Sequence, residues 1–130
     1  MQYAVPRRGV PSAASFRRWA AGFPGLTLRI VGAREGRLLN RTFRKKDRPT
    51  NVLSFAYGGD RDIVLCHPVI AREARAQGKS LAAHYAHLVV HGALHLSGHD
   101  HVTKKQAARM ENAEIRLLRR LGFADPYTVE

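Results

Sequence analysis

A long amphipathic segment that begins at Ser80 constrains the fold of this chain more than any other feature. Ser80 is a favourable N-cap residue, and the apolar residues after it repeat at helical spacing, which predicts a helix running to about Leu96. Gly98 follows, where a helix can end in a left-handed turn. The face that packs on the rest of the domain is marked by an apolar stripe: Leu81, Tyr85, Leu88 and Val89.

The rest of the chain alternates between extended and helical patterns. Strands are expected over residues 26–31, 50–56 and 62–66, with a further edge strand over residues 2–5. Gly58-Gly59 lies between two of these strands and predicts a hairpin. Helices are expected over residues 12–22, 34–43, 68–77 and 103–121 as well. This order predicts an α+β fold, a small mixed sheet with about five helices, in a single domain over residues 1–130.

Histidines are concentrated in and just after the predicted helix. His91 and His95 are four residues apart and therefore share one helical face. Beyond a turn at Gly98, the chain can fold back and bring His101 to the same point. Three neutral imidazoles with an open fourth position are typical of a catalytic zinc site. The sequence therefore predicts one Zn²⁺ ion bound by His91, His95 and His101.

Several neighbouring side chains have open roles. A helix continued past Gly98 would present His99 instead of His101 as the third ligand. Asp100 is the nearest carboxylate in sequence, and it is a candidate for acid–base chemistry or for orienting a ligand histidine. His84 and His87 precede His91 by one to two turns, and core, supporting and RNA-facing positions are all open to them.

The spacing His-x3-His-x5-His repeats the ligand spacing of the metzincin proteases. Those enzymes need a glutamate directly after the first histidine as general base, and this chain has Gly92 there. A glycine inside a helix costs about 1 kcal/mol relative to alanine. Gly92 therefore predicts close packing, or open space near the metal, and it argues against protease chemistry. A zinc metalloprotease-like hydrolase remains an alternative function.

Charge is distributed unevenly along the chain. The net charge is +12, of which residues 1–48 carry +10 and residues 49–130 carry +2. A field of this kind attracts polyanions, and arginine favours bidentate contacts with phosphate. The alternative interpretation is a basic surface with no specific partner.

Cysteine content and hydropathy indicate the compartment. The single cysteine, Cys66, excludes an internal disulfide and favours a reducing environment. We see no secretory signal and no apolar stretch long enough to cross a bilayer, so we expect a cytoplasmic protein without a membrane partner.

Two blocks of the sequence resemble one known family. The run from His91 to His101, HGALHLSGHDH, is similar to the signature of the YbeY (UPF0054) family of bacterial endoribonucleases and ribosomal RNA maturation factors. The run from Asn40 to Phe55, NRTFRKKDRPTNVLSF, resembles the family's other block. Shorter similarities extend the resemblance to about residues 12–127, at positions 62–66, 71–74, 83–87 and 122–127.

The resemblance implies a zinc-dependent, single-strand-specific endoribonuclease with a four-stranded mixed sheet and a zincin-like metal-site helix. The implied role is maturation of the 16S ribosomal RNA 3′ end and ribosome quality control. His91, His95 and His101 would be the metal ligands, and Arg44 would be the catalytic arginine that clamps the scissile phosphate or stabilises its developing charge. Implied partners are single-stranded RNA, especially small-subunit ribosomal RNA, the ribosome, a small-subunit ribosomal protein and the Era GTPase.

The chain departs from the family pattern in three places. His99 replaces a usual tyrosine, Arg61 replaces a usual glycine, and the segment over residues 56–61 is short. A non-catalytic ribosome-assembly factor with a structural zinc is a further alternative function, and bound but catalytically silent metal would favour it.

Overall fold

The computed structural model describes residues 1–57, 60–98 and 102–127. Its helices and strands follow the predicted order, and most boundaries differ from the predicted ones by one or two residues. The strands are β1 (Gln2–Tyr3), β2 (Leu26–Val31), β3 (Val52–Tyr57) and β4 (Asp60–Cys66). The helices are α1 (Ala13–Trp19), α2 (Ala33–Arg44), α3 (His67–Gln77), α4 (Leu81–Leu96) and α5 (Lys104–Arg120). The predicted α+β class is confirmed.

The four strands form one mixed sheet in the order β1-β2-β4-β3. β1, β2 and β4 run parallel, whereas β3 runs antiparallel to β4 with Ser54 opposite Ile63. The predicted antiparallel pairing of the second and third strands is therefore confirmed, and the turn residues Gly58 and Gly59 lie outside the described residues. This order places β3 at an edge of the sheet.

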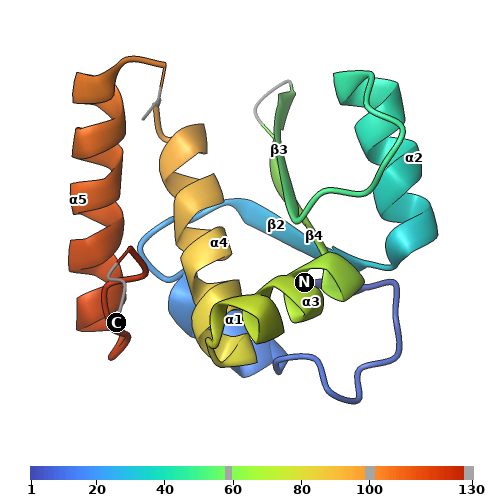
Figure 1. Cartoon of the computed structure of the whole chain (residues 1–130), viewed down its shortest axis with the longest axis horizontal. Coiled ribbons are helices and arrows are strands. Elements are labelled where there is room, and N and C mark those ends of the chain that lie inside the picture. Colours follow the sequence, from blue (N-terminus) through green and yellow to red (C-terminus); the bar gives the residue numbers. More distant parts are fainter. Residues whose placement is uncertain (58–59, 99–101, 128–130) are drawn as a thin grey trace.

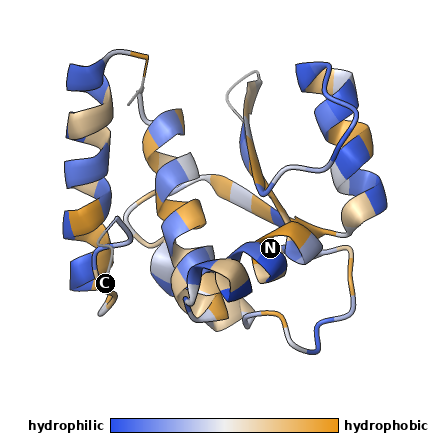
Figure 2. Cartoon of the chain, viewed as in Figure 1, coloured by the Kyte–Doolittle hydropathy of each residue, from blue (hydrophilic) through white to orange (hydrophobic). Residues whose placement is uncertain are grey.

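Helices cover both faces of the sheet (Figure 1). One face packs against α1 and α4, with α5 packed on α4, through a core that includes Phe16, Ile30, Ile63, Tyr85 and Met110. The other face packs against α2 and the start of α3 through a smaller cluster: Val31, Leu53, Val64, Cys66 and Val69, with Leu39 at its margin. Figure 2 shows the strands as mainly hydrophobic, and α2 and α5 at the two sides of the molecule as mainly hydrophilic.

Side chains cap the starts of three helices, including the one that the sequence predicts at Ser80. Ser12 Oγ accepts the backbone N–H of Ser15, and Ser80 Oγ accepts that of Ala83. Thr103 forms a capping box with Gln106, in which each side chain accepts the other residue's backbone N–H. These bonds satisfy N–H groups that the first turn of a helix leaves without an intrahelical partner.

No helix among residues 1–57, 60–98 and 102–127 is long and apolar enough to cross a membrane.

Candidate metal centre and catalytic pocket

Helix α4 carries a row of three histidines on one face. His87, His91 and His95 follow one another at intervals of four residues, so each lies about one turn from the next. The ring centroids of His87 and His91 are 6.3 Å apart. Exposure increases along the row, because the side chain of His87 is 14% exposed, that of His91 is 30% exposed, and His95 is an exposed residue.

His91 and His95 line a pocket of about 410 Å³ together with the end of α2 and the edge strand β3. Arg44, the last residue of α2, lines the same pocket, as do Asn51 and Ser54. In Figure 1, β3 stands between α4 and α2. The fold therefore brings three of the four predicted site residues, Arg44, His91 and His95, to one cavity from two distant helices.

The predicted third ligand, His101, lies outside the described residues, as do His99 and Asp100. The backbone before them is described. α4 ends at Leu96, and Gly98 takes a φ of 103°, in the left-handed region that favours glycine. The helix therefore does not continue past Gly98, which was the condition for presenting His99 one turn after His95.

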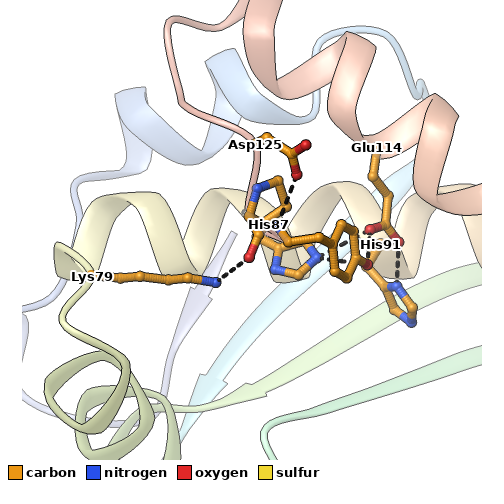
Figure 3. A network of polar contacts seen from close by, with 7 residues as sticks. Lys79, His87, His91, Glu114 and Asp125 are labelled. Carbon is orange, nitrogen blue, oxygen red and sulfur yellow. Dashed lines mark hydrogen bonds and ion pairs between the residues drawn. The ribbon is translucent and has the colours of Figure 1, made fainter. Parts of the chain in front are cut away.

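Behind His91 lies a fully buried carboxylate from α5. Glu114 Oε1 is 2.5 Å from His91 Nδ1, and Glu114 Oε2 is 3.1 Å from His87 Nε2. The Tyr127 hydroxyl donates to the same Oε2 atom. Figure 3 shows the Glu114 carboxylate directed at the two imidazole rings. Glu114 therefore accepts a hydrogen bond on each oxygen. Its contact with Nδ1 fixes the orientation of the His91 ring and leaves the other ring nitrogen, Nε2, without a contact to Glu114.

The environment of Glu114 favours its ionised form. Burial alone would raise the pKa of this carboxyl, but hydrogen bonds from His87, His91 and Tyr127 outweigh it and hold the pKa at about 2. Burial and the adjacent Glu114 carboxylate raise the pKa of the Tyr127 hydroxyl, which keeps it protonated as a donor. The network therefore places a permanent negative charge behind the His91 ring.

His87, His91 and Glu114 form a group that could hold a metal ion, since one potential ligand atom from each lies within 4.8 Å of the others. Histidine and carboxylate are suitable donors for zinc and for other divalent transition metals. A different use of the same residues follows from the short Glu114–Nδ1 contact, in which His91 would coordinate through Nε2 and Glu114 would orient it. Carboxylate–histidine–metal arrangements of this second kind are common in zinc proteins.

The sequence did not reveal Glu114. Its only signal was an acidic residue within the apolar face of α5, beside the buried residues Met110, Ala113 and Leu118. Tyr127 reaches the site from beyond α5, and the nearby chain is held by Lys79, whose Nζ donates to the Pro126 carbonyl at 2.9 Å. Figure 3 shows Lys79 and Asp125 beside this network.

His84 and His87 belong to supporting networks. His84 is buried, and its Nε2 lies 3.0 Å from Glu73 Oε1. The same carboxylate oxygen accepts Asn51 Nδ2 at 3.0 Å, so this network reaches the pocket wall through Asn51. His87 supports Glu114, as described above. Of the three roles left open for His87, the supporting one agrees with its contacts.

The C-terminal end of α2 is fixed by its packing, which positions Arg44. A Cβ atom on Gly36 would lie 2.9 Å from Cys66 Sγ, so the absence of a side chain there lets α2 approach the sheet closely. Asn40 is buried, and its Nδ2 donates to the Arg48 carbonyl at 2.7 Å. Lys45 then ends the helix in the left-handed conformation.

Exposed arginines extend along α2 away from the pocket. Arg34, Arg37 and Arg41 line one shallow hollow on this helix. Arg37 binds both oxygens of Asp47 at 2.8 Å, and this hydrogen-bonded contact lowers the pKa of the Asp47 carboxyl. Part of the positive charge of the first 48 residues is therefore gathered on the helix that ends at Arg44.

Gly92 is a close-packing glycine, as its position in a helix suggested. A Cβ atom there would lie 3.0 Å from Ser54 Oγ and 3.1 Å from Ile63 Cδ1. A side chain at this position would therefore point into the contact between α4 and the sheet. A side chain at the position that holds the general base in HExxH proteases would be crowded by Ser54 and Ile63 in this fold.

We expect Gly92→Glu to lower the free energy of unfolding by about 2–3 kcal/mol, because a long side chain over-packs this contact. Gly92→Ala is the matched control, since its gain in helix propensity of about 1 kcal/mol offsets much of the cost of one extra carbon. Urea unfolding of the metal-free proteins measures both. Equal stability of Gly92→Glu and the parent chain would contradict the packing described here.

Proteins of similar sequence belong to one family. The sequence profile of the family described as Endoribonuclease YbeY matches residues 9–122. The chain belongs to the YbeY endoribonuclease family. An endoribonuclease YbeY of Nitrosomonas eutropha is 48% identical, over 100% of this chain and 98% of the relative. One of Stenotrophomonas maltophilia is 49% identical, over 100% of this chain and 92% of the relative.

A solved structure has a similar fold. The solution structure of a Thermotoga maritima protein matches with a TM-score of 0.51 at 22% sequence identity. The match covers 89% of this chain and 88% of that protein, and at this identity it supports the fold alone. The family profile and the two relatives confirm, as family membership, the resemblance that the two sequence blocks indicated.

The buried carboxylate predicts a specific acid sensitivity. Because the folded pKa of Glu114 is about 2 and its ordinary value is 4.5, its ionised form contributes stability that is complete above pH 4.5 and is lost as pH falls toward 2. We expect metal-free protein to lose more unfolding free energy over this interval than Glu114→Gln, which has no carboxylate to protonate. Urea unfolding at several pH values tests this, and parallel profiles would contradict it.

Proposed function

We propose that this chain is a metal-dependent endoribonuclease that cleaves single-stranded RNA. The observation that carries the proposal is the convergence of Arg44, His91 and His95 on one pocket, in a chain that belongs to the YbeY family. Within this proposal the substrate is small-subunit ribosomal RNA. The roles are maturation of the 16S 3′ end and ribosome quality control in the cytoplasm.

The donor set fits one divalent ion, and we propose zinc. His91 and His95 would hold it from adjacent turns of α4, with His101 as the third ligand. Glu114 supports this arrangement, because its contact with Nδ1 of His91 would leave Nε2 as the atom that holds the ion. When bound, the ion would supply Lewis-acid activation at neutral pH.

Arg44 would bind the scissile phosphate. Its guanidinium is exposed and lines the pocket that contains His91 and His95. A planar fork of donors fits two phosphate oxygens, and its fixed positive charge stabilises negative charge that develops on the phosphate during reaction. The α2 arginines Arg34 and Arg41 would contact neighbouring phosphates of the strand.

The proposal is tested by incubating the purified, zinc-loaded protein with labelled single-stranded RNA, the matching duplex, and casein. We expect cleavage of the single strand, much slower cleavage of the duplex, and none of casein. Binding to RNA should weaken steeply as salt rises, since phosphate contacts release counterions. Protein with stoichiometric zinc that cleaves no RNA but binds ribosomes would support the non-catalytic assembly factor instead, and chelator-sensitive casein digestion would support a protease.

The resemblance also suggests partners for this function. A small-subunit ribosomal protein and the Era GTPase would place the nuclease at its RNA substrate on the ribosome. Co-sedimentation with small subunits, compared between the parent chain and a variant of the α2 arginines, tests this placement.

A further inference from the structure

An aromatic pair lies at the margin of the catalytic pocket. The rings of Phe43 and Phe55 have centroids 4.9 Å apart and planes at 62°, an edge-to-face contact between α2 and β3. Phe55 packs against the smaller core cluster under α2, whereas Phe43 is 49% exposed. Phe55 therefore anchors the pair in the fold, and about half of the Phe43 surface is exposed to solvent.

Phe43 and Phe55 border two pockets at once. The first is the 410 Å³ pocket of Arg44, His91 and His95. The second has a volume of about 480 Å³ and lies on the sheet face next to α2. Its lining includes polar side chains from two strands and α2: Thr27, Arg29, Glu35 and Asp62. A ligand that passes from one pocket to the other would cross the aromatic pair.

The second pocket has a wall of paired polar side chains. Arg29 Nε and Nη2 bind the two oxygens of Glu35 at 2.6 and 2.9 Å, and Arg29 Nη1 donates to Gln2 Oε1 at 3.2 Å. Polar groups beside an aromatic surface suit a flat ligand with hydrogen-bonding edges.

We propose that Phe43 and Phe55 form a nucleobase platform, on which an unpaired base of the RNA strand stacks while Arg44 holds the adjoining phosphate. This inference rests on the proposed function. Phe43 and Arg44 are consecutive residues, so the stacking surface and the phosphate contact lie one residue apart in the chain. Bases splayed from a single strand commonly stack on exposed aromatic rings in RNA-binding proteins.

The platform gives a physical reason for preferring single strands. In a duplex, each base is already stacked and paired, so it is not available to an aromatic ring on the protein surface. A flexible single strand turns a base outward at little cost. Stacking on Phe43 would then add to the phosphate contacts without reading sequence, because every base has a π-face.

Binding of two uncleavable oligonucleotides tests the platform. One is single-stranded RNA, and the other is an abasic ribose-phosphate strand of the same length and charge. We expect the parent chain to bind the first roughly tenfold more tightly than the second, and Phe43→Ala to lose most of this preference. Phe43→Tyr should restore it, because the phenol ring also stacks. Leu38→Ala is the matched control. Leu38 is 50% exposed on the same helix and lines the arginine hollow rather than either of these two pockets, so its loss should leave the preference for bases unchanged.

A fluorescent variant gives an independent readout. Trp19 is the only tryptophan of the chain and is buried, so Phe43→Trp adds one exposed indole. RNA with bases should quench this emission, and the abasic strand should leave it unchanged. Quenching by both strands alike, or a full base preference in Phe43→Ala, would overturn the inference.

These measurements need no cleavage, so the two proposals fail separately. A base preference that depends on Phe43 in a protein that cuts no RNA would retain the platform and reject the nuclease. Normal cleavage of RNA by Phe43→Ala, with an unchanged preference for bases, would retain the nuclease and reject the platform.

Discussion

Arg44→Ala is expected to lower the single-turnover rate of RNA cleavage by roughly 100- to 1,000-fold while zinc content stays unchanged. Arg44 contributes a fixed positive charge at the pocket that contains His91 and His95. Without Arg44, the negative charge that develops on the phosphate during cleavage would be less stabilised. The imidazoles that would bind zinc are unchanged. Metal analysis and cleavage measured on the same samples check both halves of this expectation.

Two substitutions separate the role of Arg44 from that of positive charge in general. Arg44→Lys keeps the charge but loses the planar fork, so we expect an intermediate rate. Arg41→Ala removes an arginine one turn earlier on α2, from the hollow outside the pocket. Arg41→Ala should weaken RNA binding and lower the slope of log affinity against log salt concentration by about one, as expected for the loss of one phosphate contact. The cleavage rate at saturating RNA should stay normal. Normal cleavage by Arg44→Ala would reject the proposed role.

Local patterns in the sequence were sufficient for most of the fold. Period-two and helical spacing located the strands and helices, and the N-cap at Ser80 marked where α4 begins. The positions of His91 and His95 followed from their four-residue spacing alone. Gly92 also carried information. A glycine within a helix indicated either close packing or open space near the metal, and the structure shows close packing against Ser54 and Ile63.

The tertiary partners of the site could not be predicted in the same way. Periodicity tells which face of a helix is apolar, but it does not tell which residue of another helix will lie opposite. Glu114 meets His91 across the α4–α5 contact, and Glu73 meets both His84 and Asn51. These pairs depend on how the helices dock. The sequence therefore left the role of His87 open until Glu114 was seen beside it.

His95→Ala is expected to abolish stoichiometric zinc binding, whereas His87→Ala should retain it. The two residues lie one turn on either side of His91, so the substitutions are matched in helix, residue type and distance. His95 lines the pocket with Arg44, but His87 is directed at Glu114, with Nε2 at 3.1 Å from Oε2. Zinc dissociation constants measured by competition with a chelator distinguish the variants.

The opposite result would follow from the other possible ligand set. If His87, His91 and Glu114 held the ion directly, His87→Ala would lose zinc, His95→Ala would keep it, and Glu114→Gln would behave like the loss of a ligand. If Glu114 instead orients His91, Glu114→Gln should weaken zinc binding by only about 10- to 100-fold. The buried position of Glu114 favours the orienting role, and so does the fact that both of its oxygens already accept hydrogen bonds from His87, His91 and Tyr127.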